Sequence, residues 1–203
     1  VRDMIWVIVI SLLPLLLVAY LTLIYTILWR RDGCDPDKVL GQYFGFFYFP
    51  FVSGITAVYV IWVGFPEITV RPAAIFAIPF GALIYYVTTS AWRTYTGDSL
   101  RRGHRDVFFI FPGVLVSVPE ELLFREGLAP VADIVGPVGY VVYSSLLFGM
   151  YHYKGGHHEV VFKTLLGVLL ALSYLGTESI VVPMLIHFGH NLAWLLFVSD
   201  RFP

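Results

Sequence analysis

The sequence predicts an all-α fold, a polytopic transmembrane helix bundle of about seven helices and at most eight. Three observations lead to this fold class. Apolar residues make up 58% of the chain and charged residues only 13%, whereas a soluble domain carries about 25% charged residues. The mean hydropathy is +0.79. Apolar runs that approach the ~20 residues needed to cross a bilayer recur along the chain. A single integral membrane domain over residues 1–203 is therefore expected.

The apolar runs define the expected spans. The first is too long for a removable signal peptide and lacks a cleavage-site pattern, so it is expected to remain in the membrane. The seven segments cover residues 4–29, 43–64, 73–92, 107–128, 136–153, 160–176 and 179–198. The fourth segment is long enough only if it continues through the charged stretch VPEELLFREG, which begins at Val118. These charges are therefore predicted to lie inside a helix.

The basic residues of the loops predict the orientation of the bundle. One side receives Arg30, Arg31, Lys38, Arg93, Arg101, Arg102, Arg105, Lys154 and Arg201, and the other receives Arg2 and Arg71. By the positive-inside rule the first side faces the cytoplasm. The N-terminus is then expected outside, and the loop of residues 92–106 is expected in the cytoplasm.

Features elsewhere in the sequence are given no catalytic role. The formal net charge of -1 does not suggest a nucleic-acid partner. The single Cys34 cannot form an intrachain disulfide and lies in a charged loop, so it is interpreted as a bystander. The tryptophans near the expected span ends are interpreted as anchors at the lipid headgroups; they are Trp6, Trp29, Trp62 and Trp92.

The charged stretch contains two adjacent glutamates, of which only one is expected to pair with an arginine. Glu121 lies four residues before Arg125, the spacing that brings two side chains together on one helix face. Glu120 points about 100° away from Glu121 around the helix axis. An arginine paired with Glu121 would leave Glu120 free for chemistry. Pro119, just before them, removes a backbone donor and disturbs the helical ladder.

Two later helices also carry polar side chains at membrane depth. FGMYH places His152 four residues after Phe148, and HFGHN places Asn191 four residues after His187, with His190 offset to the side. Each set alone is equally well explained as an ion pair, a helix cap or hydrogen-bonding glue between helices. Three sets on separate helices are more typical of a shared functional site, because ionisable groups in lipid are costly.

The polar residues suit the hydrolysis of an amide. A carboxylate beside a neutral imidazole can hold water and take its proton, while a second imidazole and a carboxamide donate to an oxyanion. A serine nucleophile is disfavoured, because Ser144 and Ser145 lie two turns before His152 and no Gly-x-Ser-x-Gly motif occurs. No cofactor is expected. A zinc site of Glu120, His152 and His187 remains the alternative, although the chain lacks His-Glu-x-x-His.

The three motifs together resemble a known family. The motifs are EELLFR at 120–125, FGMYH at 148–152 and HFGHN at 187–191. In this order in an apolar chain they resemble the CPBP family of CAAX proteases and bacteriocin-processing enzymes, also called Abi, which includes the Ras-converting CAAX endopeptidase. The resemblance covers residues 107–198, the motif-bearing helices. Residues 1–106 match only in being hydrophobic and are treated as variable N-terminal helices.

The resemblance implies roles for the motif residues. The family looks like a group of glutamate proteases that work inside the membrane without a metal. By this resemblance, Glu120 would activate water together with His152. His187 and Asn191 would form the oxyanion hole. The supporting residues Glu121, Arg125 and Phe148 would hold the geometry of the site. The residue after the motif arginine is often glycine in the family and is Glu126 here, which bears on the fit of the substrate.

The expected function is therefore an intramembrane endopeptidase in a multi-pass protein of the cell membrane. Its partners would be the lipid bilayer and a peptide or protein substrate cleaved near the cytoplasmic side. The non-enzymatic alternative is a membrane scaffold or a bacteriocin-immunity-type protein. A zinc-dependent intramembrane protease is a second alternative. A transporter with a proton-relaying glutamate is disfavoured, because the sequence has no paired halves or inverted repeat.

Overall fold

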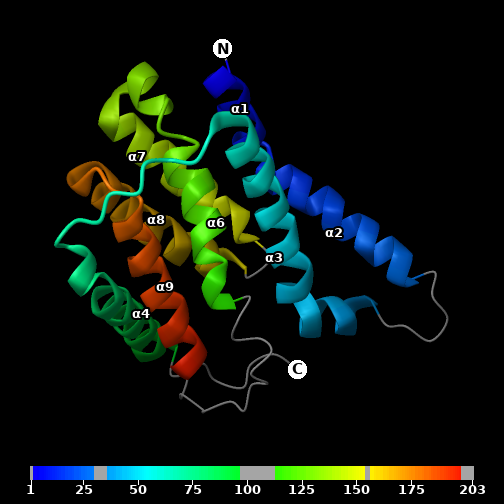
Figure 1. The fold of residues 1–203 in the computed structure, drawn as a ribbon. Helices are drawn as coiled ribbons and strands as arrows, with labels where there is room; N and C mark the ends of the chain where they lie inside the picture. The colour runs from blue at the N-terminus through cyan, green and yellow to red at the C-terminus, as the bar shows by residue number, and fades with distance from the viewer. Residues whose placement is uncertain (1, 30–35, 97–112, 154–155, 198–203) are drawn as a thin grey trace.

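The computed structural model describes residues 2–29, 36–96, 113–153 and 156–197 (Figure 1). Cys34, residues 107–112 and most of the basic loop before them lie outside these ranges. The described elements are α1 (Arg2–Ser11), α2 (Leu13–Trp29), α3 (Pro36–Val63), α4 (Ala74–Thr96), α6 (Ser117–Glu121), the π-helix η1 (Leu122–Glu126), α7 (Val131–Tyr151), α8 (His157–Thr177) and α9 (Val181–Phe197). All of them are helices, so the all-α fold class is confirmed for the described residues.

The number of membrane spans differs from the prediction. Within the described residues, α4, α7 and α8 are long and apolar enough to cross a bilayer, and the bent pair α1 and α2 qualifies as one further span. In α3 and α9 the apolar stretches that the structure describes, Phe47–Val63 and Val181–Leu196, are shorter than a full span. The predicted count of seven is therefore not confirmed. One reason is that part of the fourth expected span lies outside the described residues.

The first expected span, residues 4–29, is not a single straight helix. It breaks at Leu12, and α1 and α2 meet at a bend of 50°. Pro14 explains the break, because it has no N–H to donate and its ring collides with the carbonyl four residues earlier in a continuous helix. Leu12 N–H bonds both Ile8 O and Val9 O at 3.1 Å, as at the end of a helix.

The charged stretch is helical, as predicted, but it is short and partly a π-helix. In η1 the amide of Gly127 bonds Leu122 O at 2.9 Å, an i to i+5 hydrogen bond. Such turns are rare and occur often at functional sites. The chain then turns into α7, which is kinked at Gly136 (φ 76°) just before Pro137. The expected start of that span at residue 136 coincides with this kink.

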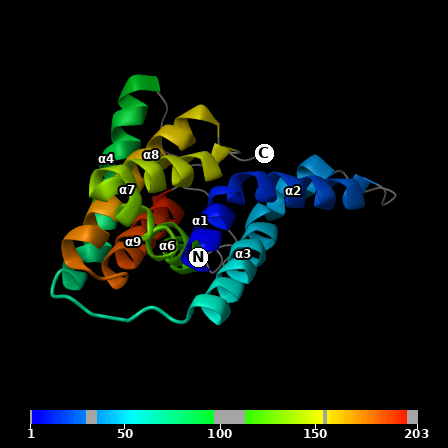
Figure 2. The ribbon, with the colours of Figure 1, turned by 90° about the horizontal axis from the view of Figure 1, so that it is seen from above.

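The stretch of α6 and η1 lies in the middle of the bundle. Figures 1 and 2 show α6 among α1, α3, α7 and α9. Two helix pairs flank it, since α4 packs along α9 and α7 packs along α8. The α4–α9 pair approaches closely through glycines: a Cβ on Gly81 would lie 1.9 Å from Ile186 O, and one on Gly189 would lie 2.1 Å from Ile78 O. Small residues at such contacts are typical of helix packing in membranes.

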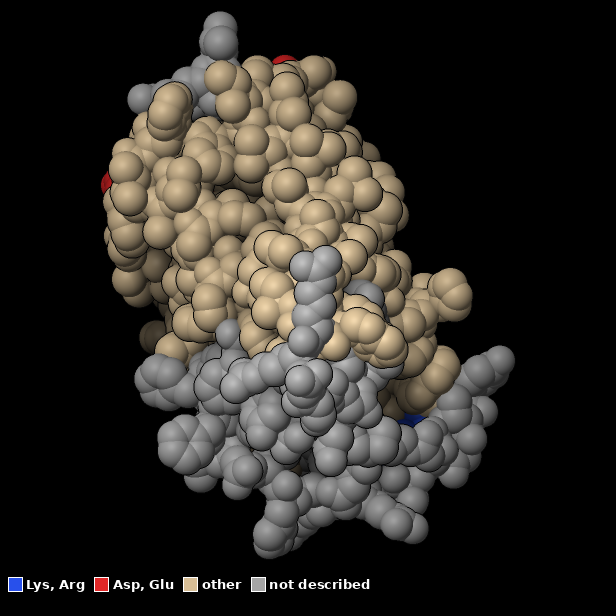
Figure 3. Space-filling view, turned by 90° about the vertical axis from the view of Figure 1, so that its right-hand side faces the viewer, with Lys and Arg blue, Asp and Glu red and all other residues tan. Residues whose placement is uncertain are grey.

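The surface and the interior are inverted relative to a soluble protein. In the view of Figure 3 the described residues form an almost entirely uncharged face, with charged atoms only at its edges. Large apolar side chains are widely exposed, for example Ile61 at 85% and Val138 at 78%, whereas Glu121 and Arg125 are each 0% exposed. This distribution suits a surface that contacts lipid and a polar interior.

One expected headgroup anchor is not on the surface. Trp6 is 7% exposed and packs edge-to-face on Tyr59, with ring centroids 5.4 Å apart. The interpretation of Trp6 as an anchor is therefore wrong, because the ring lies between α1 and α3. Trp29 and Trp62 are exposed as expected. Trp92 is partly buried and stacks on the ring of His158.

Candidate active site

The Glu121–Arg125 ion pair forms as the spacing predicts. Arg125 Nε donates to Glu121 Oε2 at 2.8 Å, and both side chains are fully buried. Arg125 Nη1 also reaches Ser144 Oγ at 3.4 Å, and the guanidinium carbon lies 5.1 Å from the centre of the Phe148 ring. A buried charge is tolerated when it is paired and hydrogen-bonded. These contacts fix Arg125, and through it Glu121, in one position.

Glu120 has a different set of neighbours. Its Oε1 accepts a hydrogen bond from the Tyr48 hydroxyl on α3, and its side chain is 1% exposed. Arg125 pairs with the adjacent Glu121 and not with Glu120. Its Oε2 is buried and has no hydrogen-bond partner among the described residues. The two adjacent carboxylates therefore differ: one is tied in an ion pair, and the other keeps an unused oxygen.

His152 approaches Glu120 from the end of α7. Its Nδ1 lies 2.8 Å from Phe148 O. Because a carbonyl can only accept, Nδ1 carries the proton and the neutral ring presents a lone pair at Nε2. Nε2 lies 3.8 Å from Glu120 Oε1, beyond direct hydrogen-bonding distance. The side chain is 18% exposed, so it lies at the open edge of the cluster.

His187 lies between the two glutamates. Its Nδ1 is 2.8 Å from Glu121 Oε1, and its Nε2 is 3.6 Å from Glu120 Oε2. Nε2 is buried and, like Glu120 Oε2, has no hydrogen-bond partner in the described part of the chain. Buried polar atoms in proteins are nearly always partnered. Two unpartnered atoms facing each other mark a position where a further polar group fits.

Asn191 and His190 occupy different faces of α9. Asn191 follows His187 by one turn and is 7% exposed. His190 contacts it weakly, with Nδ1 3.4 Å from Asn191 Oδ1, and packs edge-to-face on Tyr85 of α4. The offset of His190 agrees with the sequence. The structure thus gathers Glu120, His152 and His187, with Asn191 next along the same helix face.

Phe148 is the apolar centre of this cluster. Its ring contacts the rings of His152 and His187 edge-on, with centroids 4.7 Å and 5.4 Å away, besides lying under Arg125. One side chain thus sets the position of both imidazoles. Phe148, which the family resemblance placed among the supporting residues, packs on both histidines and on Arg125.

The sequence patterns did not reveal two groups that hold the site. Tyr48 lies in the aromatic run FGFFYFPF, and nothing in that run distinguishes it except a hydroxyl among apolar side chains. Tyr140 donates its hydroxyl to Arg125 O at 3.1 Å, which satisfies a carbonyl in the π-helix. Ser144, disfavoured as a nucleophile, instead accepts a hydrogen bond from Arg125.

The zinc alternative depends on the geometry of the donor groups. Within the ranges that the structure describes, no group of three or more His, Cys, Asp or Glu side chains has the geometry to hold a metal ion. Glu120, His152 and His187 surround one position, but at this spacing they do not form a ligand cage. The chemistry of these donors still suits zinc, so metal analysis is the deciding measurement.

Part of the chain, including the residues of this site, matches a known protein family. Residues 105–193 match the model of a family described as Rce1-like, type II CAAX prenyl endopeptidase Rce1-like. The resemblance to the CPBP family is confirmed. The matched segment contains all three motifs, and it indicates a peptide hydrolase. Together with the apolar helices it indicates a multi-pass membrane protein that processes a peptide or protein substrate. No curated protein and no solved structure matches the chain.

Proposed function

We propose that the protein is an intramembrane glutamate-type endopeptidase that cleaves a membrane-associated peptide or protein, in CAAX-type or related processing, from the cytoplasmic side. One observation carries the proposal. The buried Glu120 carboxylate lies between two imidazole nitrogens, His152 Nε2 at 3.8 Å and His187 Nε2 at 3.6 Å. These gaps are too long for direct hydrogen bonds and suit groups that share a water molecule or a substrate oxygen.

Glu120 and His152 would activate the attacking water. The water would donate one hydrogen bond to the carboxylate and the other to the lone pair of His152 Nε2. As its oxygen bonds to the peptide carbonyl carbon, one proton passes to Glu120. The same proton is then delivered to the departing nitrogen as the C–N bond breaks. A general base of this kind contributes roughly 10² to 10⁴ in rate.

His187 and Asn191 would stabilise the oxyanion of the tetrahedral intermediate. Because a carboxylate can only accept, the Nδ1–H of His187 donates a hydrogen bond to Glu121 Oε1 at 2.8 Å. Nε2 can then donate only if the ring carries both protons. The Glu121 carboxylate would balance the charge of that imidazolium, and Arg125 would hold Glu121 in place. The carboxamide of Asn191 would supply the second donor.

The test is cleavage of a peptide library by the purified protein. The library includes peptides ending in a prenylated CAAX sequence and the same peptides without the lipid, and products are identified by mass spectrometry. Cleavage by the wild type and none by Glu120→Gln is the expected result. A wild type that cleaves nothing under conditions where it remains folded would favour the non-enzymatic scaffold or immunity-type alternative.

A further inference from the structure

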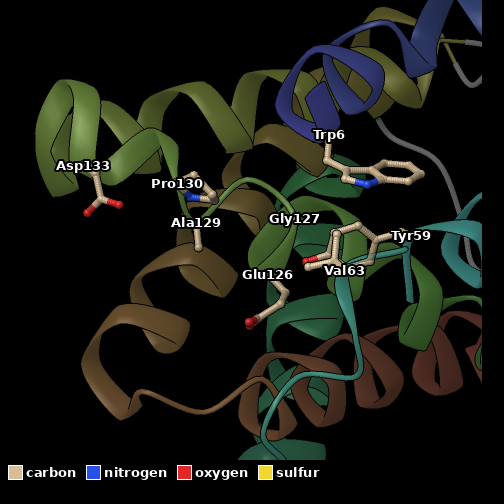
Figure 4. Close-up of a pocket in the computed structure, with 8 residues that line it drawn as sticks. All are labelled: Trp6, Tyr59, Val63, Glu126, Gly127, Ala129, Pro130 and Asp133. Carbon is tan, nitrogen blue, oxygen red and sulfur yellow. The ribbon is translucent and has the colours of Figure 1, made fainter. Parts of the chain in front are cut away.

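A cavity lies at the turn between η1 and α7, apart from the glutamate and histidine cluster. It has a volume of about 360 Å³ and is lined by Trp6 of α1, Tyr59 of α3, Glu126 of η1 and Asp133 of α7, with the backbone turn of residues 127–130 between them (Figure 4). Small-ligand sites typically have volumes of about 300 to 1,000 Å³. Among the described residues, neither Glu120 nor a histidine lines this cavity.

The polar lining of the cavity is acidic. Glu126 and Asp133 contribute carboxylates, and none of the described residues that line the cavity is basic. The Tyr174 hydroxyl donates to Glu126 Oε2 at 2.7 Å, which holds that carboxylate in place. Asp133 is exposed at the edge of the cavity. A ligand that lies between these two side chains is therefore expected to be a cation.

Two aromatic rings form the opposite side of the cavity. Figure 4 shows Trp6 and Tyr59 together, across from Asp133, with Glu126 between them. The rings meet edge-to-face at 85°. Trp6 is 7% exposed, and its Nε1 is buried without a hydrogen-bond partner among the described residues. Aromatic rings beside carboxylates suit an ammonium group. The indole N–H in addition requires an acceptor on the ligand.

The surroundings of the cavity suit a lipid. On the same helices, large apolar side chains within two residues of a lining residue are exposed, including Ile5 at 48%, Trp62 at 59% and Val135 at 55%. In a membrane these side chains contact acyl chains. A ligand with a cationic head, an oxygen-rich linker and apolar tails satisfies the carboxylates, the indole N–H and this surface together.

We propose that the cavity binds the primary-ammonium headgroup of a phospholipid. The ammonium group donates to Glu126 and Asp133 and lies against the ring faces of Trp6 and Tyr59. The indole N–H of Trp6 donates to a phosphate or ester oxygen of the lipid. Binding at this cavity is independent of the proposed hydrolysis.

Lipid competition on the purified full chain tests this binding. The protein in detergent is incubated with equal amounts of phosphatidylethanolamine and phosphatidylglycerol of identical acyl chains, and bound lipid is quantified by native mass spectrometry. Phosphatidylethanolamine is expected to be preferred. Glu126→Gln, which can still accept from Tyr174, is expected to weaken the binding of phosphatidylethanolamine about tenfold by removing a charge-assisted contact. Trp6→Phe, which keeps a ring but loses the N–H, is expected to weaken it about threefold.

Control measurements test whether this binding is specific to the cavity and to the headgroup. Glu67→Gln removes an exposed carboxylate outside the cavity and is expected to leave the lipid preference unchanged. Equal binding of the two lipids by the wild type overturns the proposal without relying on any variant. Phosphatidylcholine that binds as well as phosphatidylethanolamine overturns the primary-ammonium assignment. Displacement of the lipid by free ethanolamine at similar concentrations overturns the lipid as the ligand in favour of a soluble amine.

Discussion

Two adjacent glutamates have acquired opposite environments in this protein. Glu121 faces Arg125 and His187, each at 2.8 Å, and its charge is therefore compensated. Glu120 faces a tyrosine hydroxyl and two imidazole nitrogens that are not in hydrogen-bonding contact with it. Pairs of titratable groups placed in different environments are a general source of separate catalytic roles. This difference favours Glu120 as the base and Glu121 as the group that positions His187.

Substitution of each glutamate is expected to separate these roles. Glu120→Gln should lower the cleavage rate by at least ~10² and leave the protein folded in detergent. Glu121→Gln should lower both activity and stability, because it leaves the charge of Arg125 buried and unpaired, at a cost of about 3–5 kcal/mol. Rates and thermal unfolding are measured on the same preparations. Near-normal turnover by Glu120→Gln would show that the base is another residue.

The Tyr48 hydroxyl is expected to matter for catalysis but not for folding. Tyr48→Phe keeps the ring and removes the donor to Glu120 Oε1, a charge-assisted hydrogen bond of about 1.5–3 kcal/mol. We expect kcat to fall by about tenfold or more, while the protein still folds and its melting temperature falls by only a few degrees. Tyr143→Phe is the matched control, since Tyr143 contacts Ser11 on α1. If both variants lose the same activity, Tyr48 has no specific role at Glu120.

The donors to the oxyanion separate the metal-free mechanism from the zinc alternative. Without a metal, activity should survive exhaustive chelation, and Asn191→Ala should lose about 10² to 10³ in rate with little change in substrate binding. With zinc, chelation should stop the reaction and His187→Ala should lose bound metal, while Asn191→Ala should be mild. Elemental analysis of the active protein, together with cleavage rates after chelation, decides between the two mechanisms. Stoichiometric zinc that is lost and regained with activity would overturn the glutamate mechanism.

The sequence patterns predicted side-chain contacts within one helix but not the hydrogen bonds between helices. The i, i+4 rule located the Glu121–Arg125 pair, because both partners lie on the same short helical stretch. Tyr48 meets Glu120 from a helix 72 positions away in the sequence. No periodicity in an aromatic-rich run specifies which ring faces the site. The bond from His187 to Glu121 was missed for the same reason.

At the scale of elements, the π-helix shows what local patterns cannot predict. The carbonyl of Arg125 is satisfied by the hydroxyl of Tyr140, 15 residues later. Amphipathic periodicity shows neither this bond between elements nor the extra residue in the turn. The break at Leu12 lies two residues before Pro14, but the sequence was interpreted as one continuous span and did not give the angle of 50°.

The close contact of α4 with α9 is expected to control the position of His187 and Asn191. Gly189→Ala places a Cβ 2.1 Å from the backbone oxygen of Ile78, so α9 must shift. Overpacking of this kind typically costs about 1–3 kcal/mol, and activity should fall together with the melting temperature. Gly54→Ala in α3 is the matched control, since its Cβ would meet nothing within 4 Å. A Gly189→Ala variant as stable and active as the Gly54→Ala variant would contradict this packing.

At the scale of the whole molecule, the charged side chains of Glu120, Glu121 and Arg125 are buried and the surface is largely apolar. The buried stretch of α6 and η1 carries the ionised and hydrogen-bonded groups, and the helices around it present apolar side chains outward. Composition alone predicted this inversion and the all-α class. It could not predict that the first expected span is divided into α1 and α2.

The orientation of the bundle is the last prediction. The arginine asymmetry places the end of α4, next to Arg93, in the cytoplasm and the loop that contains Glu67 outside. Both Glu67 and Thr94 are exposed, so single cysteines can replace them in a Cys34→Ser background. In intact cells an impermeant thiol reagent should label Glu67→Cys and should leave Thr94→Cys unlabelled until the membrane is opened. Because His152 lies at the end of α7 that precedes Lys154, the same labelling pattern would place the open edge of the proposed site on the cytoplasmic side. The reverse pattern would invert the bundle and move that edge outside.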